Sequence, residues 1–375
     1  MGFRAAAGVV LAMATAITLL AWGESGPNAH GEPSMNELVF GYRALGELGL
    51  VKGAEVVARI NDRAPQPTYG DRVRVAGAPQ FTDDGRYLFA TAGDGQLAVI
   101  DTQDFTTKTV LCPYGTSLVL PGGGSSVLWW EGADRLVSID LSTEEPKPAL
   151  RQVINLPPPQ PEDGFASNNV TPPTLAAARN GRVVLQRTET LGPYWWHVYL
   201  YLIELDGSVQ RLGRERANRG GGPVNFSPDG RSLVYQAVDR NGYNWDRSVL
   251  GLIDLRTGAH NTYAPRLAEN DEVTSTELSS ALWQDNDTLR MRYQTSLRHG
   301  VLLSAPIVWE LKDGRWKIAD ERQLVQKLTV SSDKAIVIVP NESRDDRGIL
   351  CIERGGAYTR VANNVGAIVL LPEAA

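Results

Sequence analysis

Two patterns of hydrophobic and polar positions alternate along the chain. In the first, an apolar segment ends in a tight polar turn and a second apolar segment follows, as in Ala78–Ala90 and Pro223–Tyr235. These turns contain Asp-Gly, and a weaker copy contains Asn-Gly; both dipeptides tolerate positive φ and close short hairpins with the right twist. Each occurrence therefore predicts a pair of antiparallel strands. Weaker copies cover residues 118–130, 175–185, 281–291 and 328–338.

The second pattern is an apolar segment that ends in an acidic residue and a turn before the next strand. Its copies are Val99–Asp101, Ser138–Thr143, Leu202–Gly207, Leu252–Gly258, Val308–Gly314 and Cys351–Gly356. The two patterns alternate with a period of about 40 to 60 residues, so each period supplies four antiparallel strands, named A to D here. Repetition of such a unit predicts an all-β protein, a β-propeller in which each unit is one blade.

The two ends of the chain complement each other. Residues 367–373 have the pattern of an A strand, whereas residues 38–43 and 49–60 have the pattern of strands B, C and D without an A strand. We therefore predict a single propeller of seven four-stranded blades, closed by pairing of the N- and C-terminal strands. Without this closure each part-blade would expose an apolar edge. Six blades is the alternative count.

The segment Phe226-Ser-Pro-Asp-Gly230, preceded by an apolar strand, resembles the bacterial TolB-like and WD40-like propeller repeats. The pattern extends over residues 37–375, and the repeats at 78–113 and 223–266 match it most closely. The resemblance implies the fold and leaves the activity open, because such propellers include periplasmic scaffolds, ligand sensors and domains attached to enzymes.

The N-terminus is typical of an export signal. A short basic segment, Met1–Arg4, precedes an apolar run, Ala5–Trp22, and a polar stretch follows. This order predicts a signal peptide cleaved near Gly23, or an uncleaved anchor, since the run approaches the about 20 residues that span a bilayer. The predicted domains are therefore 1–23 as signal peptide or anchor, 24–36 as a flexible linker and 37–375 as the propeller. The protein is expected to be secreted or extracytoplasmic, and to contact a membrane only through an anchor.

Composition and charge narrow the classes of partner. The chain is 42% hydrophobic and 21% charged, as in ordinary globular proteins, and its net charge is −6. A negative surface repels phosphate backbones, so no nucleic-acid partner is expected. The two cysteines, Cys112 and Cys351, fall in the first and sixth units, with the shared terminal unit between them. We therefore expect two separate thiols.

No motif in the sequence assigns a catalytic chemistry. There is no Gly-x-Ser-x-Gly elbow, no P-loop and no His-Glu-x-x-His, and the Ser227–Leu233 segment lacks the aromatic residue of an aspartate box. The acidic pair Asp83-Asp84 lies in a repeated hairpin turn and is expected to be structural. No cofactor is expected, although a second acidic pair, Asp345-Asp346, leaves calcium open. The histidines are His30, His197, His260 and His299, which fall in separate segments, so a shared metal site is not expected.

The irregular loops are the better candidates for function. A–B and C–D turns share one side of a propeller and are short here, whereas B–C loops and D–A linkers share the other side and are long in units three to six. Loops of this kind, held by a rigid scaffold, commonly carry binding residues. Tyr, Trp and Arg are also the residues that anchor interfaces, and Trp stacks on sugars or cations. The predicted partner-binding residues are Tyr194, Trp195, His197, Arg240, Tyr243, Trp245, Arg247 and Arg298.

Three functions remain at the level of sequence. The first is a non-catalytic propeller that binds a protein, peptide or glycan through the irregular B–C side. The alternative is a propeller hydrolase or lyase with a metal or carboxylates at the central channel, and the third is a structural envelope module. Trp129 and Trp130 follow a regular B-strand pattern and are expected to pack in the core rather than to bind.

Overall fold

The chain folds into antiparallel sheets whose strands follow the two alternating sequence patterns. The computed structural model describes residues 38–61, 68–69, 72–73, 77–115, 117–159, 171–191, 196–217, 224–240, 246–263, 273–297, 307–320, 322, 324–341 and 347–372. All of these belong to one of the two units of the chain, Ser34–Ala375. None of these residues is helical, and so none of the described segments is a helix that could cross a membrane.

Three blades are separate four-stranded sheets in up-and-down order. Blade 1 contains β6 (Gln80–Phe81), β7 (Tyr87–Thr91), β8 (Gln96–Asp101) and β9 (Thr107–Leu111). Blade 2 contains β10 (Val119–Pro121), β11 (Ser126–Glu131), β12 (Arg135–Asp140) and β13 (Ala149–Val153). Blade 3 contains β14 (Thr174–Arg179), β15 (Arg182–Leu191), β16 (Trp196–Ile203) and β17 (Val209–Ala217). A short hairpin that the sequence patterns do not predict, β4 (Thr68–Tyr69) and β5 (Arg72–Val73), precedes blade 1.

The next two blades are joined into one sheet. Blade 4 contains β18 (Val224–Phe226), β19 (Ser232–Arg240), β20 (Asp246–Asp254) and β21 (His260–Tyr263). Blade 5 contains β22 (Val273–Trp283), β23 (Thr288–Leu297), β24 (Ile307–Lys312) and β25 (Arg315–Asp320). The joint is a short parallel pairing between β20 and β22, which the sequence does not predict.

The last sheet contains strands from both ends of the chain. Blade 6 contains β26 (Gln326–Thr329), β27 (Lys334–Pro340), β28 (Gly348–Arg354) and β29 (Ala357–Leu370). The same sheet continues with β1 (Val39–Ala44), β2 (Glu47–Lys52) and β3 (Glu55–Asn61). The first part of β29 pairs with β28, and its last part, from Val365 to Leu370, pairs with β1. We call this last part of β29, together with β1, β2 and β3, the terminal sheet.

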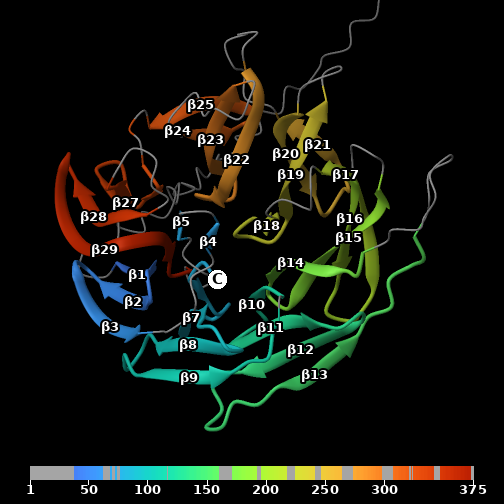
Figure 1. Ribbon diagram of the computed structural model, residues 1–375, viewed down its shortest axis with the longest axis horizontal. Coiled ribbons are helices and arrows are strands. Elements are labelled where there is room, and N and C mark those ends of the chain that lie inside the picture. The colour runs from blue at the N-terminus through green and yellow to red at the C-terminus, as the bar shows by residue number, and fades with distance from the viewer. Residues whose placement is uncertain are drawn as a thin grey trace, which may run out of the picture. The chain divides into compact units, whose positions relative to one another are not determined.

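Neighbouring sheets pack face to face around a common centre, as Figure 1 shows. The A strands β10, β14 and β18 lie nearest this centre, and apolar clusters fill the spaces between successive sheets. Leu48 and Leu50 of the terminal sheet, for example, pack with Leu88 and Ile100 of blade 1. Four-stranded antiparallel sheets packed in this way around a centre define a β-propeller.

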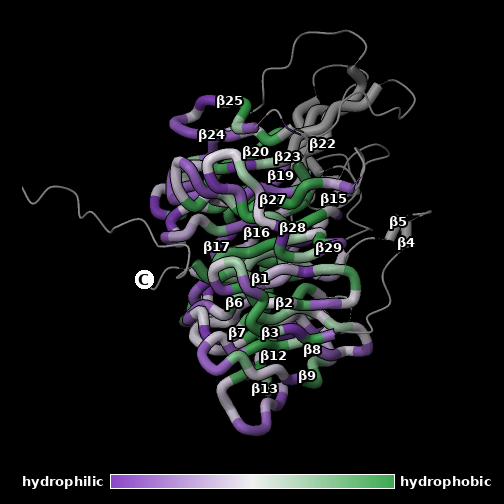
Figure 2. Tube along the Cα trace, turned by 90° about the vertical axis from the view of Figure 1, so that its left-hand side faces the viewer, coloured by the Kyte–Doolittle hydropathy of each residue, from purple (hydrophilic) through white to green (hydrophobic). Residues whose placement is uncertain are grey.

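Hydrophobic side chains are sorted to the sheet faces by strand alternation. Trp129 is fully buried between blades 1 and 2, while its neighbour Trp130 is buried between blades 2 and 3, so the prediction that both pack in the core is confirmed. Figure 2 shows the result edge-on, with hydrophobic segments running through the sheets and hydrophilic segments concentrated at their turns. Both thiols are free and buried, Cys112 and Cys351 belonging to different apolar clusters.

The first sequence pattern is explained by one turn structure that occurs in blades 1 and 4. In blade 1, Thr82 Oγ1 donates to Asp84 Oδ1 at 2.6 Å, and the same carboxylate oxygen accepts the Arg86 N–H at 3.1 Å. Ser227 and Asp229 make the equivalent contacts in blade 4, at 2.6 Å and 3.0 Å. The hydroxyl and carboxylate thus satisfy backbone groups of the A–B turn. Asp83-Asp84 lies in this hairpin turn, as the sequence pattern predicts.

The acidic residue of the second pattern has an equally local cause. Asp101, Asp140 and Asp254 each end a C strand and accept, through Oδ1, the N–H two residues further on at 2.9 Å. The carboxylate oxygen thus accepts a backbone N–H that no longer has a partner in the strand, because the strand ends there. In blades 1, 2 and 4 the acidic residue of the pattern therefore marks the C–D turn.

Side-chain amides link neighbouring A strands. Gln326 Nε2 donates to the Ile368 carbonyl at 2.9 Å, and Gln326 Oε1 accepts the Ile368 N–H at 2.9 Å. Gln284 and Thr329 form the same two-way contact between blades 5 and 6, at 2.7 Å and 3.2 Å. Each amide supplies the donor and acceptor that an inner strand edge lacks, so these contacts hold successive blades in register.

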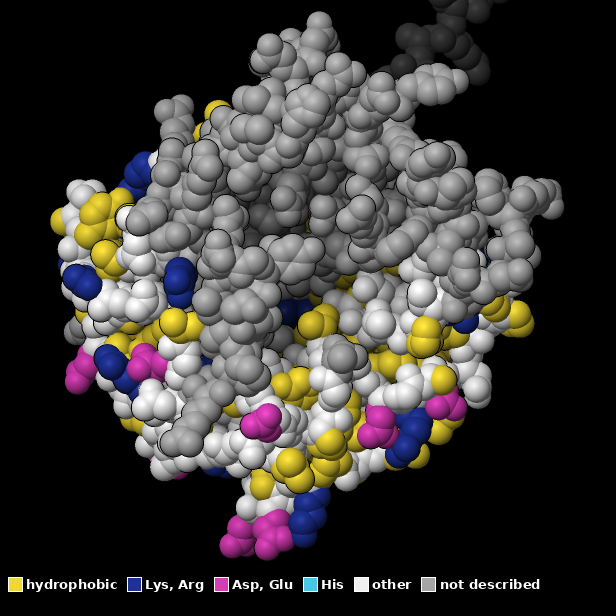
Figure 3. Space-filling view, viewed as in Figure 1, with side chains coloured by type: hydrophobic (Ala, Val, Ile, Leu, Met, Phe, Trp, Pro, Cys, Tyr) yellow, Lys and Arg dark blue, Asp and Glu magenta, His cyan; other side chains and the backbone are white. Residues whose placement is uncertain are grey.

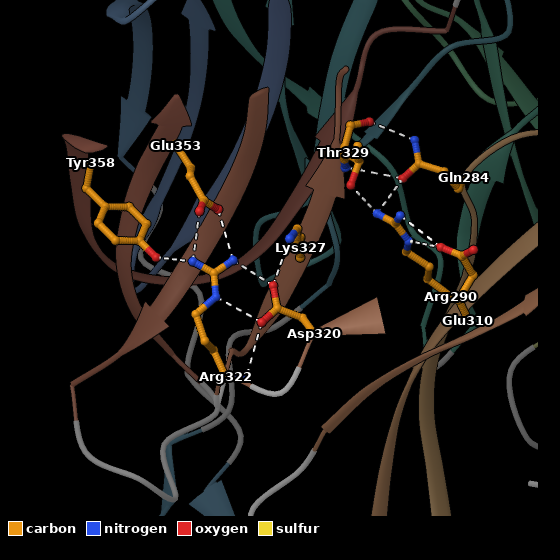
Figure 4. A network of polar contacts seen from close by, with 9 residues as sticks. All are labelled: Gln284, Arg290, Glu310, Asp320, Arg322, Lys327, Thr329, Glu353 and Tyr358. Carbon is orange, nitrogen blue, oxygen red and sulfur yellow. Dashed lines mark hydrogen bonds and ion pairs between the residues drawn. The ribbon is translucent and has the colours of Figure 1, made fainter. Parts of the chain in front are cut away.

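A network of polar contacts connects blades 5 and 6 (Figure 4). Arg322, in the linker between the blades, contacts Asp320 of β25 and Glu353 of β28, with nitrogen–oxygen distances of 2.6 Å and 2.8 Å. Lys327 Nζ lies 2.7 Å from Asp320 Oδ2. Burial alone would raise the pKa of the Asp320 carboxyl, but the hydrogen bonds from Arg322 and Lys327 outweigh it and hold that pKa well below its usual range.

Candidate functional site

The structure describes the backbone of three of the eight predicted binding residues. His197 pairs with Thr190 and Arg216 near the B–C end of blade 3. Arg240 pairs with Asp246 at the B–C end of blade 4, and Arg247 is the second residue of β20. All three lie in strands, at the ends next to the B–C turns of their blades. Tyr194, Trp195, Tyr243, Trp245 and Arg298 lie outside the described residues, as does the acidic pair at 345–346.

The B–C ends of blades 3 to 5 are taller than those of blades 1 and 2. The B strands β15, β19 and β23 have 10, 9 and 10 residues, whereas β7 and β11 have 5 and 6. Each B strand of blades 3 and 4 begins directly after its A–B turn, so the additional residues extend its B–C end. Roughly four more residues raise that end by about 13 Å.

A strand pairing stiffens this taller region. Asp246 and Arg247, at the start of β20, pair in parallel with Ser275 and Thr276 of β22. The D strand of blade 4, β21, pairs only with the later part of β20, from Leu250 to Ile253. The A strand of blade 5 thus takes the place beside β20 that a longer D strand would occupy. Blades 4 and 5 are connected at their B–C ends by backbone hydrogen bonds.

A buried charged cluster lies below the B–C end of blade 3. Glu189 is the additional residue of a β-bulge in β15, and its side chain is fully buried. Its carboxylate accepts from Arg187 Nε at 2.9 Å and from Arg211 Nη2 at 3.3 Å, and the Tyr201 hydroxyl donates to the same carboxylate. Arg187 also donates to the Pro157 carbonyl at 2.7 Å. The bulge places the carboxylate in the interior, where its partners come from β15, β16 and β17, and Arg187 connects the cluster to the linker from blade 2.

This cluster has the properties of a structural element rather than of an acid–base pair. Burial, followed by the hydrogen bond to Glu189, raises the pKa of Tyr201 to about 12, so its hydroxyl keeps its proton at neutral pH. Two guanidinium groups surround one carboxylate, an arrangement that satisfies a buried charge. The sequence reasoning missed Glu189, and the spacing Arg187-Thr-Glu189 was the only signal for it.

The axial ends of the A strands are joined by turn contacts. Asp83 Oδ2 accepts the N–H of Gly123 at 2.8 Å and the N–H of Asn180 at 3.1 Å, so one carboxylate connects the A–B turns of blades 1, 2 and 3. Within the described ranges there is no group of three or more His, Cys, Asp and Glu side chains suited to a metal ion. His260 is exposed and lies 6.4 Å, between ring centroids, from Tyr235 of its own blade. His30 and His299 fall outside the part of the chain that the structure describes.

Comparison with known proteins finds similar structures but no similar family model or curated sequence. No family model and no curated protein matches the chain. Among solved structures, an oligogalacturonate lyase in complex with manganese is 14% identical, with a TM-score of 0.49, over 87% of this chain and 85% of that chain. Dihydro-heme d1 dehydrogenase NirN is 15% identical, with a TM-score of 0.47, over 92% and 77%. The Cps50 (Swd1) β-propeller domain of Myceliophteria thermophila is 10% identical, with a TM-score of 0.42, over 83% and 95%.

These similar structures comprise two enzymes and one propeller domain, and no activity is carried over from them. The propeller fold rests on the sheets of this chain and on their packing.

Proposed function

We propose that this protein is an exported, non-catalytic seven-bladed β-propeller that binds a protein, peptide or glycan through the B–C side of blades 3 to 6. The observation that carries the proposal is the height of the B–C ends in blades 3 to 5, together with the parallel pairing that joins blades 4 and 5. Short B–C turns are sufficient to close the hairpins of a propeller. The longer B strands, and the pairing that joins two of these blades, therefore provide a surface that the fold itself does not require.

The count of seven takes the terminal sheet as the seventh blade. The pairing of β29 with β1 supports it, because it supplies the A strand that β1, β2 and β3 lack. Apolar clusters on both faces of this sheet also support it, since Phe40 and Tyr42 pack toward blade 6 while Leu48 and Leu50 pack toward blade 1. The chain's resemblance to TolB-like and WD40-like repeats agrees with this proposal.

Two observations favour binding over catalysis. Five carboxylates of the A–B turns accept hydrogen bonds from turn N–H or hydroxyl groups, namely those of Asp83, Asp84, Asp229, Asp285 and Asp333. The buried Glu189 is likewise held by two guanidinium groups and a phenol. Each of these carboxylates therefore has structural partners that account for its position.

Affinity capture from the native envelope tests the binding surface. The intact chain is compared with a Tyr243→Ala/Trp245→Ala variant, and we expect the variant to lose about tenfold or more of the captured partner, as anchor residues do. Leu205→Ala is the matched control, because Leu205 is 68% exposed in the C–D turn of blade 3, on the opposite side. Equal capture by the intact chain and the double variant would contradict the proposal.

The catalytic alternative is tested with divalent metals in a thermal-shift assay. A binding propeller is expected to show no metal-specific change in Tm. A large rise with one metal would favour the hydrolase or lyase with an axial metal or carboxylate site.

A further inference from the structure

Exposed aliphatic side chains gather on the B–C side of the terminal sheet and of blades 1 and 2, away from the taller blades. Leu45, Leu111, Leu118 and Val153 are 41%, 64%, 53% and 49% exposed. Figure 3 views the molecule from the same direction as Figure 1, and hydrophobic side chains are concentrated over β8, β9, β11 and β12 in its lower half. We call these four residues the apolar shelf.

Strand register places all four on one side of the propeller. Leu45 lies in the β1–β2 turn of the terminal sheet. Leu111 ends β9 and pairs with Gln96, the first residue after the B–C turn of blade 1. Val153 ends β13 and pairs with Arg135, the first residue after the B–C turn of blade 2.

Leu118 directly precedes β10, next to Ser117, whose hydroxyl donates to the Trp130 carbonyl at 2.6 Å near the same B–C turn. Leu111 and Leu118 do not belong to the apolar core clusters. Their neighbours in sequence, Val110 and Val119, are the buried residues there. Packing within the chain therefore does not explain an aliphatic residue at these positions.

The charges beside the shelf are mainly negative. Four carboxylates lie at the same B–C ends, those of Glu47, Asp94, Glu131 and Asp134. Three described guanidinium groups lie there: Arg59, 3.9 Å from Glu47; Arg135, 3.0 Å from Glu131; and Arg43, which is fully buried and donates to the Thr91 carbonyl at 3.0 Å. Asp94 is exposed in the B–C turn of blade 1, close to Leu111. The net charge of the chain, −6, has the same sign.

We infer that the apolar shelf binds a basic segment of a partner protein, one that presents aliphatic or aromatic side chains next to Lys or Arg. The apolar residues of the segment cover Leu111 and Leu118, and a cationic side chain lies against Asp94. Aliphatic contact supplies most of the affinity, while the carboxylates select against acidic segments. This inference rests on the proposed function in taking the B–C side as the binding side, and it adds a second contact region and the chemistry of the partner.

Selection from a displayed library of random short peptides on the full-length protein tests the inference. We expect the selected peptides to be rich in Lys or Arg and in Leu, Phe or Trp. Their affinity should fall about tenfold or more in Leu111→Ser/Leu118→Ser and in Asp94→Lys, the fall expected for anchor residues. Leu205→Ser, an equally exposed leucine on the opposite side, should leave it unchanged, and the Tm of each variant verifies that the fold is intact.

Other outcomes separate this inference from the proposed function. Peptides that bind the shelf variants as well as the wild type, yet lose affinity in Tyr243→Ala/Trp245→Ala, overturn the inference and leave the proposed function standing. Selected peptides that are acidic overturn it as well. No peptide enrichment combined with binding on a glycan array overturns the peptide partner but retains a binding propeller.

Discussion

At the scale of single residues, two tyrosines show why certain strand positions must be glycine. Tyr235 of β19 lies directly opposite Gly251 of β20, and Tyr42 of β1 lies opposite Gly49 of β2. A Cβ atom added at Gly251 would lie 1.9 Å from Cζ of Tyr235, and one at Gly49 would lie 2.2 Å from the Tyr42 ring. Each aromatic ring therefore covers the neighbouring strand where a side chain is missing.

Gly251→Ala is expected to destabilise the protein by about 1–3 kcal/mol, because the added methyl group forces the Tyr235 ring out of its packed position. Urea unfolding measures the change. The same substitution in a Tyr235→Leu background should cost clearly less, since the ring that meets the methyl group is then absent. An equal cost in both backgrounds would show that the ring contact does not explain the glycine.

At the scale of structural elements, several ion pairs connect blades 5 and 6. Arg322 joins Asp320 to Glu353, while Arg290 lies 2.9 Å from Glu310 and donates to the Thr329 hydroxyl (Figure 4). The Asp320 side chain is only 7% exposed, so its charge depends on these partners rather than on water. The stability that this contact supplies is therefore expected to depend on pH.

Arg322→Met is expected to lower the free energy of unfolding by about 2 kcal/mol near neutral pH, as loss of hydrogen bonds to charged groups does. The folded-state pKa of Asp320 is depressed, so its stabilisation is present above the ordinary carboxyl pKa of about 3.9 and is lost as pH falls below it. The difference between variant and wild type should therefore shrink in acid. Urea unfolding at several pH values measures it.

Arg315→Met provides the control for this prediction, because Arg315 is exposed in β25, at the turn with β24. It should change stability little at any pH. A constant difference between Arg322→Met and wild type from neutral to acid pH would refute the role assigned to Asp320.

At the scale of the whole molecule, the terminal sheet depends on both ends of the chain. Ile368 and Val365 of β29 are buried against β1 and blade 6, and the Leu371 N–H donates to the Val39 carbonyl at 3.2 Å. The pairing of β29 with β1 covers one edge of each strand. The first described strand is consequently stabilised by the last strand of the chain.

A chain truncated after Val365 is expected to lose at least about 3 kcal/mol of stability, since it loses the buried Ile368 and the strand beside β1. It should also unfold less cooperatively, because β1, β2 and β3 then have an unpaired edge. Urea titration followed by circular dichroism measures the midpoint and the m-value, with a chain truncated after Pro372 as control. Equal midpoints for the two chains would contradict the proposed closure.

Much of the fold could be predicted because its signals are local. The Thr82-to-Asp84 and Ser227-to-Asp229 turns carry their hydrogen bonds within a few residues, and so their sequence pattern marks each turn directly. The alternation of apolar residues likewise placed Trp129 and Trp130 in the core. The candidate site was predicted less completely: the sequence indicated the B–C side of blades 3 to 6, but it did not indicate Glu189 or the apolar shelf.

The sequence by itself determined the repeating unit, the turn chemistry and the complementarity of the two ends, because neighbours along the chain or alternation along a strand encode all three. Only the tertiary structure decided which residues from separate blades meet. The pairing of β20 with β22, the carboxylate of Asp83 between three turns, and the charged contact at Arg322 all join segments distant in sequence. The exposure of Leu111 and Leu118 was also decided by the tertiary structure. A leucine at a strand end is buried only if a neighbouring blade covers it.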